Sequence, residues 1–325
     1  MLDIRGLFTK EAIVRYLMAL PVLKTPVMDT IFATRPQHPL PMLGVDDVSV
    51  VANPLPVVRR GAPSISAVSE SGNIAFYEPL PVSAHKSVTG ADLLNLQMLR
   101  GDGLEAWARE KTDLLRRVCR LTTEALCALA LTGTVEWPVQ LEKGGWEVYK
   151  IEYGDPLSAI PGTLWDAGGV KLKAVFELLT AMQESIQDNG FGGQIVTWAG
   201  KAAYNALFAI AEASVTTAKM RVEITEKGID VGGYLVERRS ERNRNPQTGA
   251  MTPVVADDDV VMVALDAGHK LPYCALDDLD ANLQPLPFFV KPIKKSDPSS
   301  YRLVGMSKPF PVPNVKGICR ATVLS

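Results

Sequence analysis

Histidine supplies most of the general bases in enzymes, and this chain of 325 residues contains only three: His38, His85 and His269. A Ser-His-Asp triad or a Cys-His dyad would have to use one of them. Each lies in a short stretch that contains proline, glycine or polar residues, and none of these stretches contains a nucleophile signature. We therefore expect all three to be exposed loop residues, and the sequence disfavours an enzyme that uses histidine.

The four cysteines, Cys119, Cys127, Cys274 and Cys319, form no Cys-x-x-Cys pair. The first two lie on one predicted helix, roughly 80° apart around its axis. Such spacing suits small buried hydrophobic residues better than metal ligands or a disulfide framework. It also favours folding in a reducing cytoplasm.

Two groups of carboxylates have the composition of a cation site. Residues 278–282 are similar to the start of an EF-hand loop, but Leu283 stands where that loop needs glycine and Phe289 where it needs glutamate. Asp257 to Asp259 offer carboxylates to a divalent cation, although a solvated turn before a strand at 260–265 is the ordinary interpretation. The sequence predicts no metal site, no cofactor-binding residue and no catalytic residue.

Two further motifs are candidates for phosphate binding. Gly190-Phe191-Gly192-Gly193 follows a predicted helix and precedes a strand, whereas phosphate-binding glycines follow a strand and open a helix. We expect a helix C-cap there. An arginine cluster with interleaved glutamates suits either phosphates or contacts with neighbouring copies, and its alternating charges favour the second. The cluster comprises Arg238, Arg239, Arg242 and Arg244, with Glu237 and Glu241.

Composition narrows the class of protein. With 47% hydrophobic and 22% charged residues the chain is globular, and its length exceeds that of one ordinary domain. A formal charge of −2 excludes an affinity that rests on net positive charge. No stretch without a charged residue exceeds 12 residues, and a membrane helix needs ~20 apolar ones. Charged residues from Asp3 to Arg15 interrupt any secretory signal.

The helices and strands that position these residues can be predicted from the distribution of proline and the spacing of apolar residues. A segment without proline, 82–137, contains a long helix between Gly103 and Gly133. Its predicted apolar face comprises Leu104, Trp107, Leu114, Leu115, Val118, Leu121, Ala125, Leu126 and Leu129. Charges of both signs occupy the rest: Glu105, Arg109, Glu110, Asp113, Arg116, Arg117, Arg120 and Glu124.

The remainder is a mixture of strands and helices. The sequence predicts a hairpin at 135–153, helices at 172–187 and 201–213, and strands at 194–198, 220–225, 234–238 and 260–265. This is an α+β chain without βαβ repetition, so neither a doubly wound sheet nor an eight-fold barrel is favoured.

Residues 48–87 predict a long β-hairpin with too few large apolar side chains to bury itself. An isolated two-stranded hairpin is marginally stable in water. It therefore needs a partner surface, and a single subunit offers no obvious one.

The order of these features resembles the major capsid proteins of tailed phages, in particular the lambda-like gene E family. Residues 27–32 are similar to the family's entry segment, followed by the long hairpin and the long helix. Gly233-Tyr234 and the polar hairpin with Gly249 are similar to its later β-rich region. Residues 301–313 are similar to its closing strand and Ser-x-Pro-x-Pro step. The resemblance covers nearly the whole chain, and it rests on collinearity rather than on one motif.

The resemblance implies the Hong Kong 97-type capsid fold, and its regions transfer by position. They are an N-terminal arm at 1–47, an extended loop at 48–97, a peripheral domain at 98–190 with spine helix 103–133, an axial domain at 191–275 and C-terminal strands at 276–325 that return to the peripheral domain.

The implied function is a structural head protein, not an enzyme, that self-assembles into an icosahedral shell around double-stranded DNA. Its partners would be other copies in hexamers and pentamers, a separate scaffolding protein, a portal, an optional decoration protein and DNA contacted non-specifically, without a membrane. It would assemble in the host cytoplasm and reside in the virion. A soluble α+β enzyme or ligand-binding oligomer, and a tail-tube or ring protein, are the alternatives.

Overall fold

The computed structural model describes residues 4–40, 43–45, 75–98, 101–141, 144–214, 221–297 and 299–325. Its contacts divide the chain into two compact units, each assembled from three separate segments. Unit 1 comprises Met1–Gly44, Phe76–Glu124 and Lys270–Pro311; unit 2 comprises Val45–Ala75, Ala125–His269 and Val312–Ser325.

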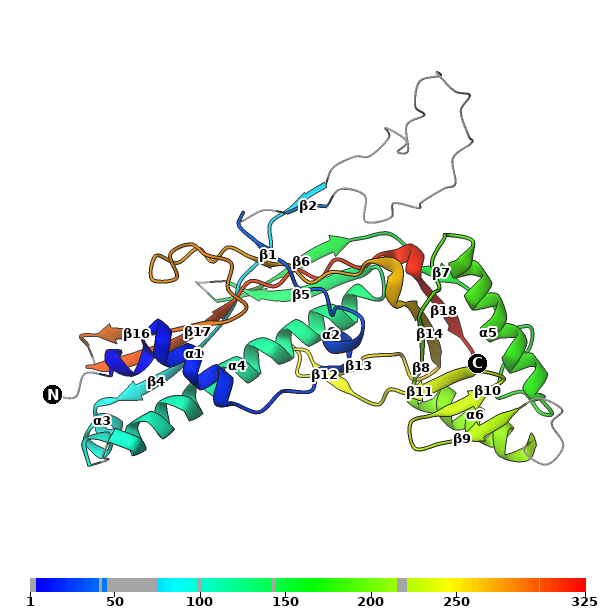
Figure 1. Cartoon of the computed structure of the whole chain (residues 1–325), viewed down its shortest axis with the longest axis horizontal. Helices are drawn as coiled ribbons and strands as arrows, with labels where there is room; N and C mark the ends of the chain where they lie inside the picture. The colour runs from blue at the N-terminus through cyan, green and yellow to red at the C-terminus, as the bar shows by residue number, and fades with distance from the viewer. Residues whose placement is uncertain are drawn as a thin grey trace, which may run out of the picture. The chain divides into compact units, whose positions relative to one another are not determined.

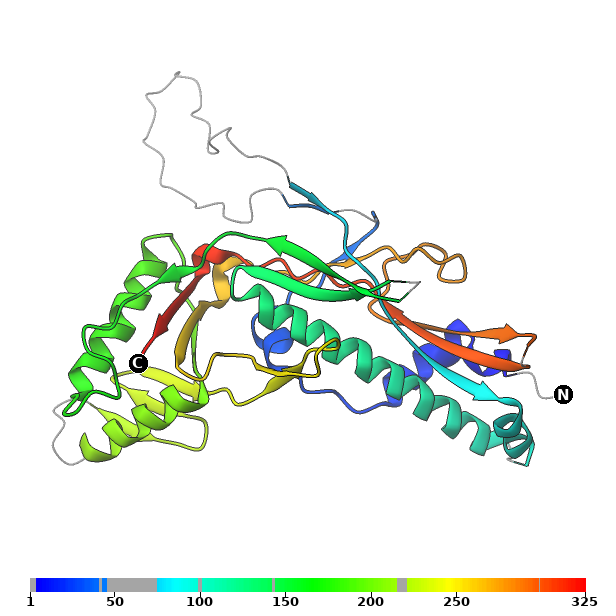
Figure 2. The ribbon, with the colours of Figure 1, turned by 180° about the vertical axis from the view of Figure 1, so that it is seen from behind.

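A three-stranded antiparallel sheet is the centre of unit 1 (Figures 1 and 2). Strand β17 (Ser300–Ser307) lies between β16 (Phe289–Lys295) and β4 (Val82–Thr89). Alternate residues of β17 are buried, so one face of the sheet is turned to a core. Helix α1 (Lys10–Ala19), the 3-10 helix η1 (Arg5–Phe8), α3 (Gly90–Gln97) and the spine helix contribute to that core.

The long helix predicted between residues 103 and 133 is confirmed as α4 (Gly101–Ala130). Its predicted apolar face is only partly correct. Leu115 is buried with Ala108 and Cys119, whereas Leu114, Val118 and Leu121 are between 41% and 61% exposed. Successive helical residues lie ~100° apart, so the two sets form adjacent stripes, and the core covers only one of them.

The N-terminal arm contains α1, the short helix α2 (Pro26–Thr30) and strand β1 (Gln37–His38). Strand β1 pairs in parallel with β15 (Tyr273–Cys274). The arm is therefore attached to unit 1 both through helices and through backbone pairing.

The hairpin predicted at 48–87 requires a correction. Residues 82–89 form β4, which pairs with β17 instead of with a hairpin partner. Residues 46–74 lie outside the described part of the chain. The strands on either side, β2 (Leu43–Val45) and β3 (Ala75–Tyr77), form a two-stranded sheet.

Unit 2 contains a mixed seven-stranded sheet in the order β7-β18-β14-β8-β11-β10-β9. The strands are β7 (Leu157–Ser158), β8 (Ile195–Ala199), β9 (Val222–Ile224), β10 (Ile229–Val231), β11 (Tyr234–Arg238), β14 (Asp259–Ala264) and β18 (Ile318–Thr322). Strand β14 is buried along its whole length, as its continuous apolar run predicts for a central strand. Helices α5 (Leu172–Gln187) and α6 (Lys201–Ser214) share one hydrophobic core with the sheet.

Helices α5 and α6 and three of the four predicted strands, β8, β11 and β14, are confirmed to within a residue or two, and β9 lies within the fourth, predicted at 220–225. The predicted division at residue 190 does not follow the packing, because α5 and β8 lie in the same core. The last strand also differs from the prediction. Strand β18 pairs with β14 and β7 in unit 2, and only β16 and β17 of the C-terminal region belong to the sheet of unit 1.

Two hairpins complete the fold. The predicted one is confirmed as β5 (Thr134–Gln140) paired with β6 (Trp146–Glu152). In the other, β12 (Arg242–Arg244) pairs with β13 (Met251–Pro253) through a turn in which Gly249 has a φ of 72°. The predicted turn therefore needs glycine at this position.

Candidate functional site

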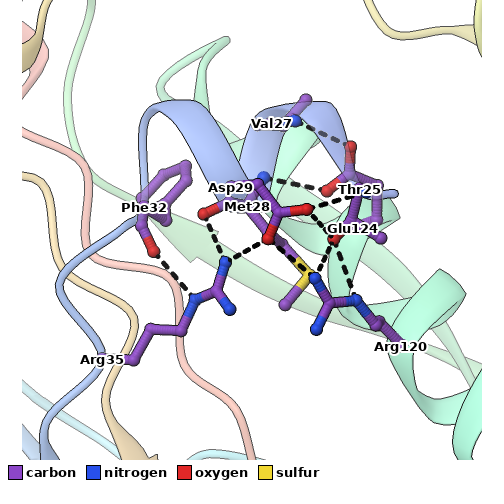
Figure 3. Close-up of polar contacts among 8 residues, drawn as sticks. All are labelled: Thr25, Val27, Met28, Asp29, Phe32, Arg35, Arg120 and Glu124. Carbon is purple, nitrogen blue, oxygen red and sulfur yellow. Dashed lines mark hydrogen bonds and ion pairs between the residues drawn. The ribbon is translucent and has the colours of Figure 1, made fainter. Parts of the chain in front are cut away.

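A network of charged side chains joins α2 to the spine helix α4 in unit 1 (Figure 3). The Glu124 carboxylate, on α4, accepts hydrogen bonds from the backbone N–H groups of Val27 at 2.8 Å and Met28 at 2.9 Å. The first N–H groups of a helix have no acceptor within that helix, and the N-cap residue Thr25 provides no side-chain cap. Glu124, only 5% exposed, therefore caps α2 from a position 96 and 97 residues away.

Asp29 is the second carboxylate of this network. Its Oδ1 accepts a hydrogen bond from Arg35 and another from Arg120, each at 2.7 Å. Its Oδ2 accepts bonds from the backbone and the hydroxyl of Thr25, both at 2.9 Å. Arg120 also donates to the Thr25 hydroxyl, and Arg35 to the Met28 carbonyl at 2.7 Å. Two guanidinium groups thus balance two carboxylates.

The two carboxylates have opposite pKa shifts. Burial, reinforced by the charge of Asp29, raises the pKa of Glu124, although the N–H bonds from Met28 and Val27 act against it. Partial burial acts on Asp29 too, but hydrogen bonds from Arg35 and Thr25 and the charge of Arg120 outweigh it and lower its pKa. On acidification Glu124 therefore takes up a proton before Asp29 does.

Sequence reasoning identified only one side of this network. Residues 27–32 were recognised as an entry segment, and proline at the first helical position is the signal that α2 begins there. Arg120 and Glu124 were assigned to the charged side of the long helix. Their spacing of four residues puts them on one face, but that pattern is the same for solvated charges and for a helix-capping pair.

A buried polar network in unit 2 centres on His269, which sequence reasoning expected to be exposed. The side chain is 2% exposed; its Nδ1 accepts the Asn314 backbone N–H at 3.0 Å and its Nε2 donates to the Ala264 carbonyl at 3.1 Å. The Asn314 amide donates to the Ala267 carbonyl at 3.0 Å. Burial lowers the pKa of His269 to about 4. The imidazole is therefore a neutral connector between the chain after β14 and the segment before β18.

The other histidines and the cysteines are positioned differently. His85 is exposed, as expected, but lies on β4, and His38 is half-buried on β1. All four cysteines are buried, as predicted. Burial raises the pKa of Cys119 to about 12 and that of Cys274 and Cys319 to about 11. Such thiols are poor nucleophiles.

The predicted acidic motifs hold side chains of the same chain. Lys291 Nζ lies 2.7 Å from a carboxylate oxygen of each of Asp278 and Asp280. Asp259 was expected in a solvated turn, but it begins β14 and accepts hydrogen bonds from Arg320 and Thr322, both at 2.7 Å. Among the described residues no group of three or more His, Cys, Asp or Glu side chains is arranged to hold a metal ion.

The glycine motif follows the end of α5, as predicted. Gly190 has a φ of 81°, and the N–H groups of Gly192 and Gly193 donate to the Asp266 carboxylate at 3.2 and 2.8 Å. The anion held by these glycines is therefore a side chain of unit 2 itself.

The arginine cluster is partly paired within unit 2. The Arg239 guanidinium stacks on Trp198, with its carbon 4.3 Å from the ring centroid, and lies 2.6 Å from Glu237. Arg242 lies 2.9 Å from Asp257. These two arginines have structural roles.

No helix in the described part of the chain combines the length and apolar character that a bilayer crossing requires.

The architecture matches phage capsid proteins of known structure. The putative capsid protein of a prophage of Escherichia coli CFT073 aligns with a TM-score of 0.65 and 15% identity, over 97% of this chain and 99% of that chain. A phage-related protein from Bordetella bronchiseptica RB50 aligns at 0.52 and 12%, over 97% of each chain. The capsid protein of cyanophage A-1(L) aligns at 0.51 and 11%, over 98% of this chain and 99% of that one. These likenesses define the fold, which is the Hong Kong 97-type capsid fold.

Sequence comparison then gives the family. Residues 9–323 match the family described as phage major capsid protein E, so the chain belongs to that family. The resemblance drawn from the order of its elements is confirmed, and the protein is a structural major capsid protein of a phage virion. No curated protein sequence gives a match.

Proposed function

We propose that copies of this chain assemble into hexamers and pentamers that close into an icosahedral shell around phage double-stranded DNA. The chain acts as a building unit and not as an enzyme. The observation that carries this proposal is the family match over residues 9–323. A closed shell gives every copy an equivalent set of neighbours by symmetry.

Exposed apolar surfaces support the self-association. On α4 the stripe of Leu114, Val118 and Leu121 is turned to solvent, and on hairpin β5–β6 Trp146 and Val148 are 42% and 59% exposed. Contiguous apolar surface of this kind marks contact sites in soluble proteins. We assign both surfaces to contacts with other copies of this chain.

We further propose that the segment predicted as the extended loop lies across a neighbouring subunit. Its base supports this, because the flanking strands β2 and β3 pair with each other. Both ends of residues 46–74 therefore start from the same small sheet. In the same scheme unit 1 supplies the peripheral region, and residues 191–275 together with α5 supply the region at the centre of each hexamer and pentamer.

The remaining partners belong to the same proposal. A separate scaffolding protein guides assembly in the cytoplasm of a bacterial host, a portal occupies one vertex, and a decoration protein is an optional addition to the outside. The enclosed DNA is contacted without sequence specificity, and a net charge of −2 means that the chain as a whole does not bind it strongly.

Expression of the full chain, with and without a scaffolding partner, followed by negative-stain electron microscopy tests the proposal. We expect shells, rings of subunits or polymers. Stacked rings that never close would instead indicate a tube protein. A stable monomer or dimer under all conditions would contradict self-assembly.

A further inference from the structure

The three-stranded sheet of unit 1 has an unusual distribution of charge. Strands β4, β16 and β17 contain no aspartate or glutamate. Their basic residues are His85, Lys86, Lys291, Lys294, Lys295 and Arg302. For a protein with more acidic than basic residues overall, this sheet is a local excess of positive charge.

Strand register separates these residues onto two faces. Tyr301 and Leu303 of β17 are turned to the core, so Arg302 between them is turned to the opposite face. Arg302 pairs with Ser87 on β4 and Ile293 on β16. His85, Lys291 and Lys295 are each two residues from those partners and therefore share the face of Arg302. Lys86 and Lys294 pair with the core-facing Leu303 and Tyr301 and belong to the other face.

His85, Arg302 and Lys295 form a diagonal row across the sheet. His85 and Lys295 are both diagonal neighbours of Arg302 on adjacent strands, a relationship that places side chains ~7–8 Å apart. Burial first, and then the charges of Arg302 and Lys295, lower the pKa of His85. The direction agrees with the register, which places Arg302 and Lys295 near His85.

Arg302 and Lys295 are not paired with the carboxylates that lie on this face. Neither Arg302 nor Lys295 forms a salt bridge among the described residues, and Arg302 Nε is buried without a hydrogen-bond partner. Asp278 and Asp280 reach the same face, where both are held by Lys291. Asp92, on α3, acts on Lys86 of the other face. Asp297, in the turn after β16, is exposed.

We propose that His85, Arg302 and Lys295 form a face that binds the phosphate backbone of double-stranded DNA. The inference rests on the proposed function, in which DNA is the polyanion enclosed by the shell. A row of cations on a flat sheet suits a repeating line of phosphates, which needs charge and no base contacts. An acidic protein partner is less favoured, because the centre of a protein interface normally offers a pocket or an exposed aromatic anchor, and this row offers neither.

Binding at this face is coupled to protonation of His85. A phosphate beside the imidazole favours its charged form, whereas Arg302 and Lys295 favour the neutral form in the free protein. Phosphate binding therefore takes up a proton, and by linkage acidification strengthens the binding.

Because side chains alternate between the two faces along a strand, a neighbouring residue on the opposite face provides a matched control for each substitution. Binding of the full chain to a short labelled DNA duplex is measured by fluorescence anisotropy from about 50 to 200 mM salt. We expect Lys295→Gln to reduce the slope of log affinity against log salt by about 0.9, the contribution of one phosphate contact. The neighbouring Lys294→Gln, on the opposite face, should leave the slope unchanged.

The histidine is tested in the same assay between about pH 7.5 and 5.5. We expect the affinity of the unmodified protein and of Lys86→Gln to rise on acidification, and that of His85→Gln to stay constant. Circular dichroism of each variant establishes that it is folded.

Two results would overturn the assignment. One is an equal slope for Lys294→Gln and Lys295→Gln. The other is a Lys295-dependent affinity for polyglutamate with no such affinity for DNA, which would indicate an acidic protein partner. Electron microscopy of the unmodified protein is scored separately, so failure to form shells contradicts the proposed function, whereas shells with equal slopes contradict only the DNA-binding face.

Discussion

The Glu124 carboxylate on the spine helix accepts a hydrogen bond from the backbone N–H of Met28 in the N-terminal arm, at 2.9 Å. With the second bond from Val27, this buried side chain replaces the N-cap that α2 lacks. A helix of five residues is too short to be stable alone. Its presence on α4 therefore depends on contacts that α4 provides, and Glu124 contributes the polar part of them.

Glu124→Gln should destabilise the subunit by about 1–3 kcal/mol, because the amide NH₂ group then faces a backbone N–H that is buried without an acceptor. Urea denaturation of the unassembled chain, followed by tryptophan fluorescence, measures the free energy of unfolding. Glu110→Gln, on the same helix but exposed, is the control and should change that free energy by less than about 0.5 kcal/mol. Equal effects of the two substitutions would contradict the capping role.

Gly305→Ala should also destabilise the subunit, by about 1–3 kcal/mol. A Cβ atom at Gly305 would lie 2.8 Å from Leu115 Cβ and 3.2 Å from the Phe288 ring, so β17 and α4 approach closely only because no side chain is present. Gly162→Ala is the matched control, since nothing lies within 4 Å of its added Cβ. The same denaturation measurement applies, and an unchanged unfolding midpoint for Gly305→Ala would show that this contact is not tight.

Periodicity determined the elements that were predicted well. Helix α5 was expected at 172–187 and is observed at Leu172–Gln187, because its apolar residues recur at helical spacing and Asn189-Gly190 ends the pattern. Helix α4 was located for the same reason. Local patterns are sufficient where a segment's own side chains decide its conformation.

The contacts that were missed join residues far apart in the sequence. His269 lies between glycine and lysine, as an exposed loop residue would, and its burial involves a hydrogen bond with Asn314, 45 residues later. Leu114 and Leu115 are neighbours with the same side chain, yet one is exposed and the other buried. Their difference in exposure is set by the width of the surface that packs on α4. The periodicity of apolar residues carries no information about that width.

His269 makes the stability of unit 2 dependent on pH. Its pKa is lowered in the folded state from 6.5 to about 4, so on acidification the unfolded chain binds the proton first. The free energy of unfolding should therefore be greatest above pH 6.5 and fall by about 3 kcal/mol as the pH decreases toward 4. Denaturation at several pH values measures this loss. His269→Gln should remove most of the slope and His38→Gln should retain it; a slope that persists in His269→Gln would assign it to other groups.

The exposed stripe of α4 should matter for assembly and not for folding. Leu114→Gln combined with Leu121→Gln removes apolar surface that the subunit itself leaves exposed, so thermal melting by circular dichroism should be nearly unchanged. Shell formation should be lost, since another copy would then have to bury polar amides against apolar partners. Thr122→Gln, at a half-buried position beside the stripe, is the control. Normal shells from the double variant would show that the stripe is not an intersubunit contact.

Deletion of the predicted extended loop tests assembly separately from folding, if the deletion leaves the observed strands intact. Removal of residues 48–87 would delete β3 and six of the eight residues of β4, which pair with β17 in the sheet of unit 1, so it would damage the subunit itself. Removal of residues 48–72 with a short Gly-Ser linker leaves β2, β3 and β4 intact. We expect this variant to melt cooperatively, like the full chain, and to form no stable shells by electron microscopy, because the surface proposed to overlap the neighbouring subunit is missing. Deletion of 82–87 alone is the contrasting variant and should lower the melting temperature. Shells of normal appearance from the 48–72 deletion would refute the assignment of this segment to intersubunit overlap.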